Sequence, residues 1–112
     1  MREGDIVLAL LPQADGQLKN RPALFLRDLP PFGDALLCGI STKLARAVQG
    51  FDEVIQPPDD DFGSSGLVSA SVIRLGFLAV LPRNQLLGSI GQISEDRRKR
   101  LLNNLSEHLL SS

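Results

Sequence analysis

Proline and glycine residues cut this chain into short apolar segments, and this pattern limits the folds that it can adopt. The sequence has 112 residues, of which 10 are glycine and 7 are proline. Between these turn-forming residues lie runs rich in Val, Ile and Leu, with the length and composition of strands. The predicted strands span residues 5–11, 22–27, 35–40, 51–56, 67–75, 76–81 and 86–93. Short strands separated by turns predict a small, mainly β barrel or a strongly curved sheet.

One helix is predicted, and it lies at the C-terminus. Ser94 is a favourable N-cap residue, and Glu95 and Asp96 fall in the first turn, where the helix dipole favours acids. Leucines that we expect to pack on the barrel then recur at helical spacing, namely Leu101, Leu102, Leu105 and Leu109. The strands and this helix predict a single α+β domain over residues 1–112, without repeats or linkers.

The connections between the strands carry their own expectations. Residues 12–20 form a polar connection that is long for a tight hairpin, and residues 43–50 are a loop or a single helical turn. Residues 63–66 are expected to be flexible. The acidic run at residues 59–61 follows two prolines and is expected to be a solvated loop. The basic run at residues 97–100 is expected to form a solvated face of the C-terminal helix.

Composition excludes several functional classes. The chain is 43% hydrophobic and 22% charged, which is typical of a globular protein. A net charge of -1 argues against a protein that coats nucleic acid by bulk charge, although it permits a local basic groove. No apolar run approaches the ~20 residues needed to span a bilayer, and the N-terminus does not resemble a signal peptide. We therefore expect a cytoplasmic protein without a membrane partner.

Most reaction types require residues that this chain lacks or holds in isolation. Cys38 is the only cysteine, so it can form neither an internal disulfide nor a zinc site, and we expect a small buried apolar residue. His108 is the only histidine and lies near the end of the helix, where a structural role through the dipole is expected. No glycine-rich phosphate loop and no metal-ligand spacing occur. Neither a cofactor nor a metal is expected.

A small group of cations and hydroxyls remains. Arg21 precedes Pro22, and proline pushes the preceding residue into extended geometry, so Arg21 is expected at the mouth of the second strand. Ser41 and Thr42 follow the third strand. If these two strands are antiparallel neighbours, all three side chains share one rim of the sheet. A guanidinium beside hydroxyls suits a phosphate oxyanion. Solvated side chains without a task are the competing interpretation.

The order of several short motifs resembles the PemK/MazF family of toxins from bacterial type II toxin–antitoxin systems. The motifs are GDIV at residues 4–7, RPAL at 21–24, CGIST at 38–42, LVSASVIR at 67–74, and the last strand with its helix. The resemblance implies an SH3-like or CcdB-like curved barrel that forms a homodimer. It also implies a metal-independent endoribonuclease that cuts single-stranded RNA and so inhibits translation and growth. A cognate antitoxin is implied as a partner.

The resemblance also implies roles for individual residues. The RNA 2′-hydroxyl would attack the adjacent phosphorus, Arg21 would stabilise the phosphorane, and a hydroxyl of Ser41 or Thr42 would bind a non-bridging oxygen. Arg21 is assigned electrostatic stabilisation, because a guanidinium with a pKa above ~12 is a poor proton acceptor. The residues expected to bind RNA are Gln17, Lys19, Asn20, Lys43, Arg46 and Arg74.

Three positions depart from the family pattern. Ser41 stands where threonine is common, and Ser71 stands where many members carry an acidic or amide side chain. The connection at residues 12–20, which helps to cover RNA in the family, has its own sequence. Two alternatives therefore stay open. One is a gyrase-directed, CcdB-like binding protein on the same fold, in which the C-terminal helix carries the effect. The other is a degenerate member that only binds a partner.

Overall fold

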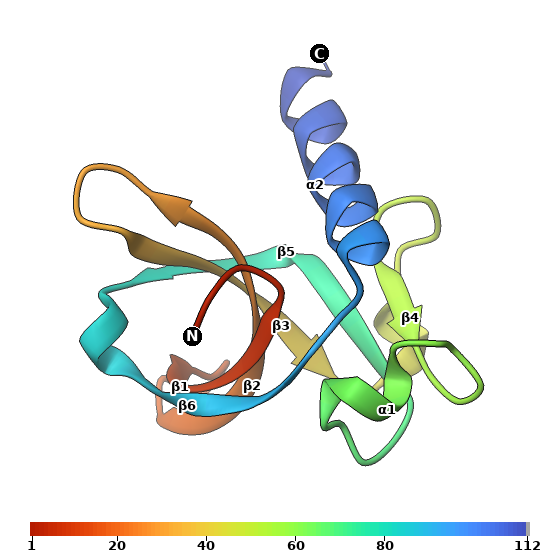
Figure 1. Ribbon diagram of the computed structural model, residues 1–112, viewed down its shortest axis with the longest axis horizontal. Helices are drawn as coiled ribbons and strands as arrows, with labels where there is room; N and C mark the ends of the chain where they lie inside the picture. Colours follow the sequence, from red (N-terminus) through yellow and green to blue (C-terminus); the bar gives the residue numbers. More distant parts are fainter. Residues whose placement is uncertain (112) are drawn as a thin grey trace.

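A curled antiparallel sheet dominates the computed structural model, which describes residues 1–111 (Figure 1). Its strands are β1 (Asp5–Pro12), β2 (Leu18–Leu29), β3 (Asp34–Ser41), β4 (Glu53–Ile55), β5 (Ser71–Leu81) and β6 (Leu86–Gln92). They are ordered β4-β5-β3-β2-β1-β6, and each neighbouring pair is antiparallel. The sheet curls into a half-open barrel. The predicted mainly β fold with a C-terminal helix is confirmed.

The helices are short except for the last one. They are α1 (Phe62–Ser65), α2 (Glu95–Leu110) and the 3₁₀ turns η1 (Leu44–Arg46) and η2 (Arg83–Gln85). As predicted, Ser94 caps α2, and its hydroxyl oxygen accepts a hydrogen bond from the Arg97 N–H at 3.1 Å. Figure 1 shows α2 following β6 and running beside β4. Over residues 1–111, every helix is too short or too polar to cross a membrane.

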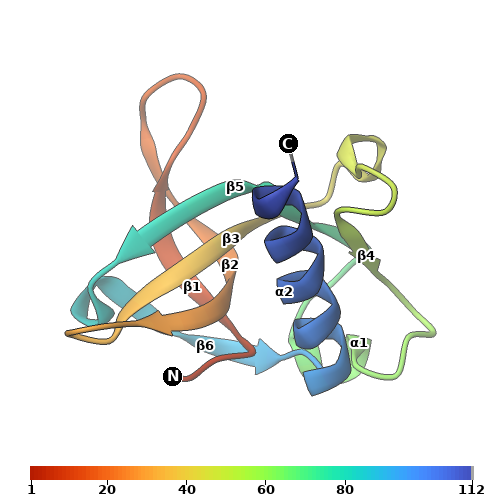
Figure 2. The ribbon, with the colours of Figure 1, turned by 90° about the horizontal axis from the view of Figure 1, so that it is seen from above.

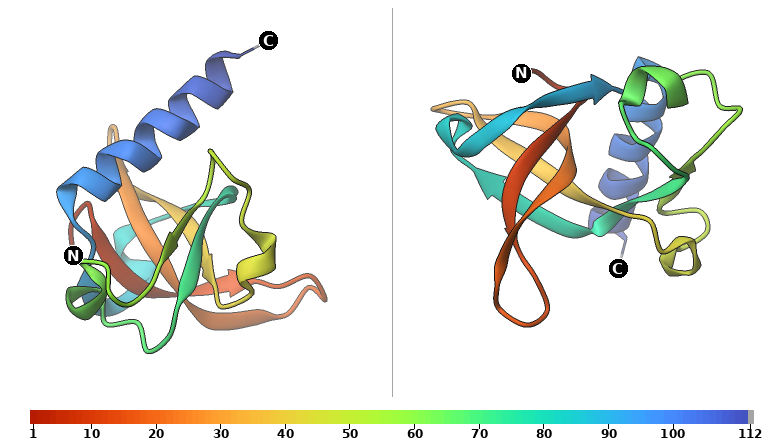
Figure 3. Two further views of the ribbon diagram at one scale, coloured as in Figure 1. Left: turned by 90° about the vertical axis from the view of Figure 1, so that its right-hand side faces the viewer. Right: turned by 90° about the horizontal axis from the view of Figure 1, so that it is seen from below.

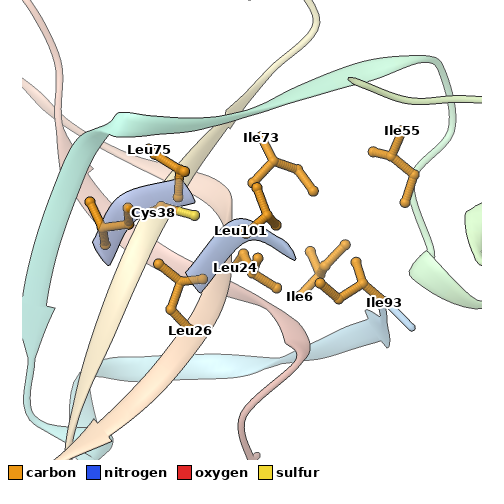
Figure 4. Packing of buried hydrophobic residues seen from close by; sticks show 10 residues of the cluster. Ile6, Leu24, Leu26, Cys38, Ile55, Ile73, Leu75, Ile93 and Leu101 are labelled. Atoms are coloured by element: carbon orange, nitrogen blue, oxygen red, sulfur yellow. The ribbon is translucent and has the colours of Figure 1, made fainter. Parts of the chain in front are cut away.

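The core under α2 is aliphatic (Figure 4). Leu101 and Leu105 of α2 are buried against residues from several strands, including Ile6, Leu24, Leu26, Ile73 and Leu75. Burying each leucine contributes about 2 kcal/mol, which docks the helix on the sheet. Leu109 is 69% exposed, so the prediction that it packs on the barrel is wrong. The helix has passed the edge of the core by this turn.

Cys38 and His108, the only cysteine and the only histidine of the chain, both contact apolar side chains of the fold. Cys38 is fully buried in the same core, as predicted. Burial, with a smaller effect from the charge of Asp52, raises the pKa of the Cys38 thiol, which keeps it protonated and unreactive. The His108 ring lies against Phe51, with ring centroids 4.9 Å apart.

Strand β2 begins at Leu18, so the prediction that it begins at residue 22 is wrong. The β1–β2 ladder continues outward through the pairs Ala9↔Arg21, Leu11↔Lys19 and Pro12↔Leu18. Pro22 is tolerated inside the strand because the β2–β3 ladder begins only at Ala23, so β2 has no second neighbour there. Arg21 therefore lies within a two-stranded arm rather than at a strand mouth. The expected long connection shortens to a tight loop at residues 13–17.

The two strands predicted at residues 67–75 and 76–81 are one strand, β5, which begins at Ser71. In the ladder with β3, Gly39 pairs with Arg74 and Cys38 pairs with Leu78. Residues 75–77 are therefore a bulge, and bulges bend a strand without ending it. Gly76 lies at this bend, which explains why the sequence pattern looked like a break.

The charged runs are only partly solvated, so the prediction of two solvated runs is wrong for the buried Asp61 and Arg97. Arg97 is buried, and its guanidinium holds the buried Asp61 through Nε–Oδ2 (2.8 Å) and Nη2–Oδ1 (3.0 Å). It also donates to Glu53 at 2.9 Å. Arg98 is largely shielded and pairs with Glu3 and Glu95, whereas Lys99 and Arg100 are exposed as predicted, although Arg100 also pairs with Glu53. The sequence pattern missed Asp61 and Glu53 as partners of Arg97 because they lie 36 and 44 residues away along the chain.

The segment expected to be flexible, residues 63–66, belongs to α1 and its C-terminal cap. Gly66 adopts a left-handed conformation with φ +75°, and a Cβ there would lie 2.1 Å from the Ile90 carbonyl oxygen. Only glycine satisfies both requirements. The segment is thus a short helix packed against β6, and the prediction of flexibility is wrong.

Candidate functional site

A groove of about 870 Å³ lies where strand ends meet three connecting loops. On one side stands the β1–β2 hairpin, and on another stands η1; both can be followed in the right-hand view of Figure 3. The loop at residues 67–69 and the start of β5 contribute further lining. The volume is within the range of ligand sites in proteins.

The groove brings together the three residues predicted to be catalytic. Arg21 from β2, Ser41 at the end of β3 and the following Thr42 all line it. They meet because β2 and β3 are antiparallel neighbours, which places the early part of one strand beside the end of the other.

Half of the residues predicted to bind RNA also line the groove. These are Lys43, Arg46 and Arg74. Gln17, Lys19 and Asn20 do not; they are exposed on the hairpin, which projects from the body in Figure 2. Lys19 lies two residues before Arg21 and so shares its face of the strand, farther out along the arm.

Ion pairing distinguishes the groove cations from other basic residues. Within the described residues, five arginines pair with acids, namely Arg27, Arg83, Arg97, Arg98 and Arg100. The four groove cations make no ion pair there; they are Arg21, Lys43, Arg46 and Arg74. The groove lining includes one acid, Asp15. Although the chain carries a net charge of -1, this groove is therefore locally positive and suits an anion.

The hydroxyl groups of Ser41 and Thr42, at the end of β3, differ in their hydrogen bonding. The Ser41 Oγ accepts a hydrogen bond from the Lys43 N–H at 3.1 Å. This turn fixes the Ser41 oxygen and leaves its hydroxyl proton free to donate toward the groove. Thr42 is exposed, and within residues 1–111 its hydroxyl makes no hydrogen bond. Both can donate to a bound oxyanion.

Ser71 plays a local part that the sequence did not indicate. Its side chain is buried, and its hydroxyl donates to the Ser69 carbonyl oxygen at 2.9 Å. This bond ties the loop at residues 67–70 to the beginning of β5. Both serines line the groove, so Ser71 shapes its wall.

Several other lining residues were missed by sequence reasoning. Phe77 and Gly39 line the groove, as does Val68, whose side chain is 98% exposed. A glycine inside a strand often marks a close approach of another group, so Gly39 could have indicated that a side chain packs against β3 at this position. In the structure that side chain is Phe77. Among residues 1–111, no three His, Cys, Asp or Glu side chains gather as a metal site would require.

Comparison with known proteins agrees with this architecture. A family model described as "PemK-like, MazF-like toxin of type II toxin-antitoxin system" matches residues 2–109. Among solved structures, the Mycobacterium tuberculosis toxin MazF-mt6 is similar, with a TM-score of 0.68 and 20% sequence identity over 94% of this chain and 95% of that chain. This likeness shows a shared fold. A comparison with curated proteins finds no match. Because the family model spans nearly the whole chain, the protein belongs to the PemK-like, MazF-like toxins of type II toxin–antitoxin systems.

Proposed function

We propose that this protein is an endoribonuclease that cuts single-stranded RNA in the groove without a metal ion, and so inhibits translation and growth. The observation that carries the proposal is the gathering of cations and hydroxyls in one groove. Arg21 and three other cations lack ion pairs in the described chain, and they stand with Ser41 and Thr42 along the same lining. A phosphodiester backbone supplies the anions that such a lining binds.

The proposed reaction uses the substrate's own nucleophile. The RNA 2′-hydroxyl attacks the adjacent phosphorus, and loss of the 5′-oxygen leaves a 2′,3′-cyclic phosphate and a 5′-hydroxyl. Arg21 stabilises the charge that develops on the phosphorane. Ser41 or Thr42 donates a hydrogen bond to a non-bridging oxygen. Arg21 stays protonated throughout, so water takes the proton of the 2′-hydroxyl and supplies a proton to the departing 5′-oxygen.

The remaining predicted residues are proposed to bind the strand on either side of the cut. Lys43, Arg46 and Arg74 contact phosphates within the groove. Gln17, Lys19 and Asn20 contact RNA along the projecting hairpin, where Lys19 extends the cationic face that begins at Arg21.

The family also supports a proposal about partners. We expect a homodimer that acts in the cytoplasm and binds a cognate antitoxin. An acidic antitoxin segment would match the positive groove and block RNA. A gyrase-directed activity needs no phosphate site, so the cations in this groove favour the nuclease.

Cleavage of single-stranded RNA in EDTA tests the proposal. The wild-type protein is expected to cut and to leave cyclic phosphate ends, whereas Arg21→Ala is expected to lower the cleavage rate at least 100-fold, as for loss of an oxyanion-stabilising group. Arg27→Ala is the matched control, because Arg27 is an exposed arginine of the same strand that pairs with Glu3 outside the groove. Unchanged cleavage by Arg21→Ala would contradict the site, and topoisomerase inhibition without RNA cleavage would contradict the activity.

A further inference from the structure

One aromatic side chain lies in the groove. The chain has five phenylalanines and neither tryptophan nor tyrosine. Of these five, Phe77 lines the groove, and it is partly exposed there. Proteins that hold single-stranded nucleic acid combine a positive groove with aromatic rings on which bases stack. The groove cations bind phosphates in the proposed function, and the Phe77 ring is available for a second kind of contact.

The bulge in β5 sets the direction of Phe77. Residues 75–77 have no partners in the ladder with β3, so they are free to depart from regular alternation. The bulge is held by Asp52, whose Oδ1 accepts a hydrogen bond from the Leu75 N–H at 2.9 Å. Bulges commonly re-aim a side chain beside a functional site. Here the re-aimed side chain is an aromatic ring at the lining of the groove.

The Phe77 ring packs against the β3 backbone at Gly39. A Cβ at Gly39 would lie 3.0 Å from Phe77 Cδ1 and 3.2 Å from Cγ, so the ring rests directly against the β3 backbone. Phe77 also packs against the core cluster that includes Val7, Phe25 and Leu37. Since Gly39 pairs with Arg74, the ring and a groove cation meet at one place.

We propose that Phe77 is a stacking platform for one base of the bound RNA. The inference rests on the proposed function, because it takes single-stranded RNA as the occupant of the groove. Arg74 holds a phosphate beside the stacked base. The exposed Val68 offers further apolar surface along the same lining. Because every base has a π-face, this contact adds affinity without a strict choice of base.

Fluorescence provides a direct test. Phe77→Trp introduces the only indole of the chain, since the natural sequence has no tryptophan or tyrosine. The probe is a 2′-O-methyl oligoadenylate octamer, which lacks the attacking hydroxyl and stays intact. Its binding is expected to quench the indole fluorescence, whereas an abasic octamer with the same backbone leaves it unchanged. Equal signals from the two octamers, or bound oligoadenylate without quenching, would overturn the proposal.

Affinity provides the second test. Phe77→Leu keeps an apolar side chain and removes the ring, so oligoadenylate is expected to bind roughly 5- to 100-fold more weakly, while the abasic octamer binds as before. Phe62→Leu is the matched control, because Phe62 is a half-buried phenylalanine outside the groove. It is expected to leave both affinities unchanged. If Phe77→Leu weakens both octamers equally, the ring only shapes the groove and the proposal fails.

These results separate the stacking proposal from the nuclease proposal. Base-dependent quenching together with intact natural RNA would support stacking and refute the nuclease. Cleavage of natural RNA together with unchanged oligoadenylate binding by Phe77→Leu would support the nuclease and refute stacking. Failure of oligoadenylate to bind at all would also refute stacking, and the cleavage assay would still decide the activity.

Discussion

Asp61 shows how strongly a single residue depends on its surroundings in this fold. Burial alone would raise the pKa of the Asp61 carboxyl, but hydrogen bonds from Arg97 and from the Ser94 N–H outweigh it and lower the pKa to about 2. The carboxylate thus joins the N-terminus of α2 to the turn before α1. An unpaired charge at either residue would be costly, since both side chains are almost completely buried.

The lowered pKa predicts a pH dependence of stability. The folded-state pKa of Asp61 lies below its ordinary value of 3.8, so its contribution to the free energy of unfolding is fully present above about pH 4 and is lost as the pH falls toward 2. This contribution amounts to about 2 kcal/mol. Urea unfolding should therefore show a stability gap between the wild type and Asp61→Asn that narrows between pH 4 and pH 2. A gap that stays constant with pH would contradict the assignment, and the exposed Asp60→Asn serves as the control.

The sequence predicts the grouping of the groove residues more readily than it predicts the ion pair between Arg97 and Asp61. Arg21 and Ser41 were placed together because adjacent antiparallel strands fix which ends meet, and that rule needs only strand order. Arg97 and Asp61 are 36 residues apart, and no local pattern marks one as the partner of the other. Each therefore looked like part of a solvated charged run.

At the scale of elements, the bulge of β5 couples stability to the groove. Asp52 accepts hydrogen bonds from the N–H groups of Leu75 and Val48, so it satisfies a donor that the β3 ladder cannot reach. Arg74 and Phe77 flank or belong to this bend, and both line the groove. Their positions depend on a carboxylate that lies before β4 in the chain.

Asp52→Ala is expected to reduce the free energy of unfolding by about 1–3 kcal/mol, because the Leu75 N–H loses its partner. Oligoadenylate binding should weaken as well, since the bend no longer holds Arg74 and Phe77 in place. Chemical denaturation and binding titrations measure the two effects. Asp34→Ala is a suitable control because, among residues 1–111, the Asp34 side chain makes no hydrogen bond, so its effect should stay within about 0.5 kcal/mol. Equal stabilities for the two variants would contradict the role of Asp52.

The elements also show where sequence patterns were sufficient. β3, β6 and α2 were predicted to within about one or two residues, since turn residues or a helix cap mark their ends locally. β5 was divided in two because Gly76 resembles a break, while the distant Asp52 allows the strand to continue through it. β2 was predicted too short because pairing with β1 extends the strand outward past Pro22.

At the scale of the whole molecule, paired and unpaired cations lie in different places: arginines outside the groove pair with acids, whereas the groove cations do not within the described part of the chain. The acids Glu3, Asp28, Glu53, Asp61 and Glu95 neutralise arginines outside the groove. The groove cations keep their charge available for a ligand. A net charge of -1 could not indicate this arrangement, because composition says nothing about which charges pair.

The unpaired cations of the groove predict a steep dependence of RNA affinity on salt concentration. Each phosphate neutralised on a single strand contributes about -0.7 to the slope of log affinity against log salt concentration. With all four groove cations engaged, the slope is about -3, so affinity for the uncleavable oligoadenylate falls roughly 50-fold between 50 and 200 mM salt. Arg46→Ala removes one phosphate contact and should make the slope shallower by about 0.7. Lys99→Ala removes an exposed cation of α2 outside the groove and should leave the slope unchanged. If both variants shift the slope equally, RNA responds to the overall charge of the protein and not to the cations of this groove.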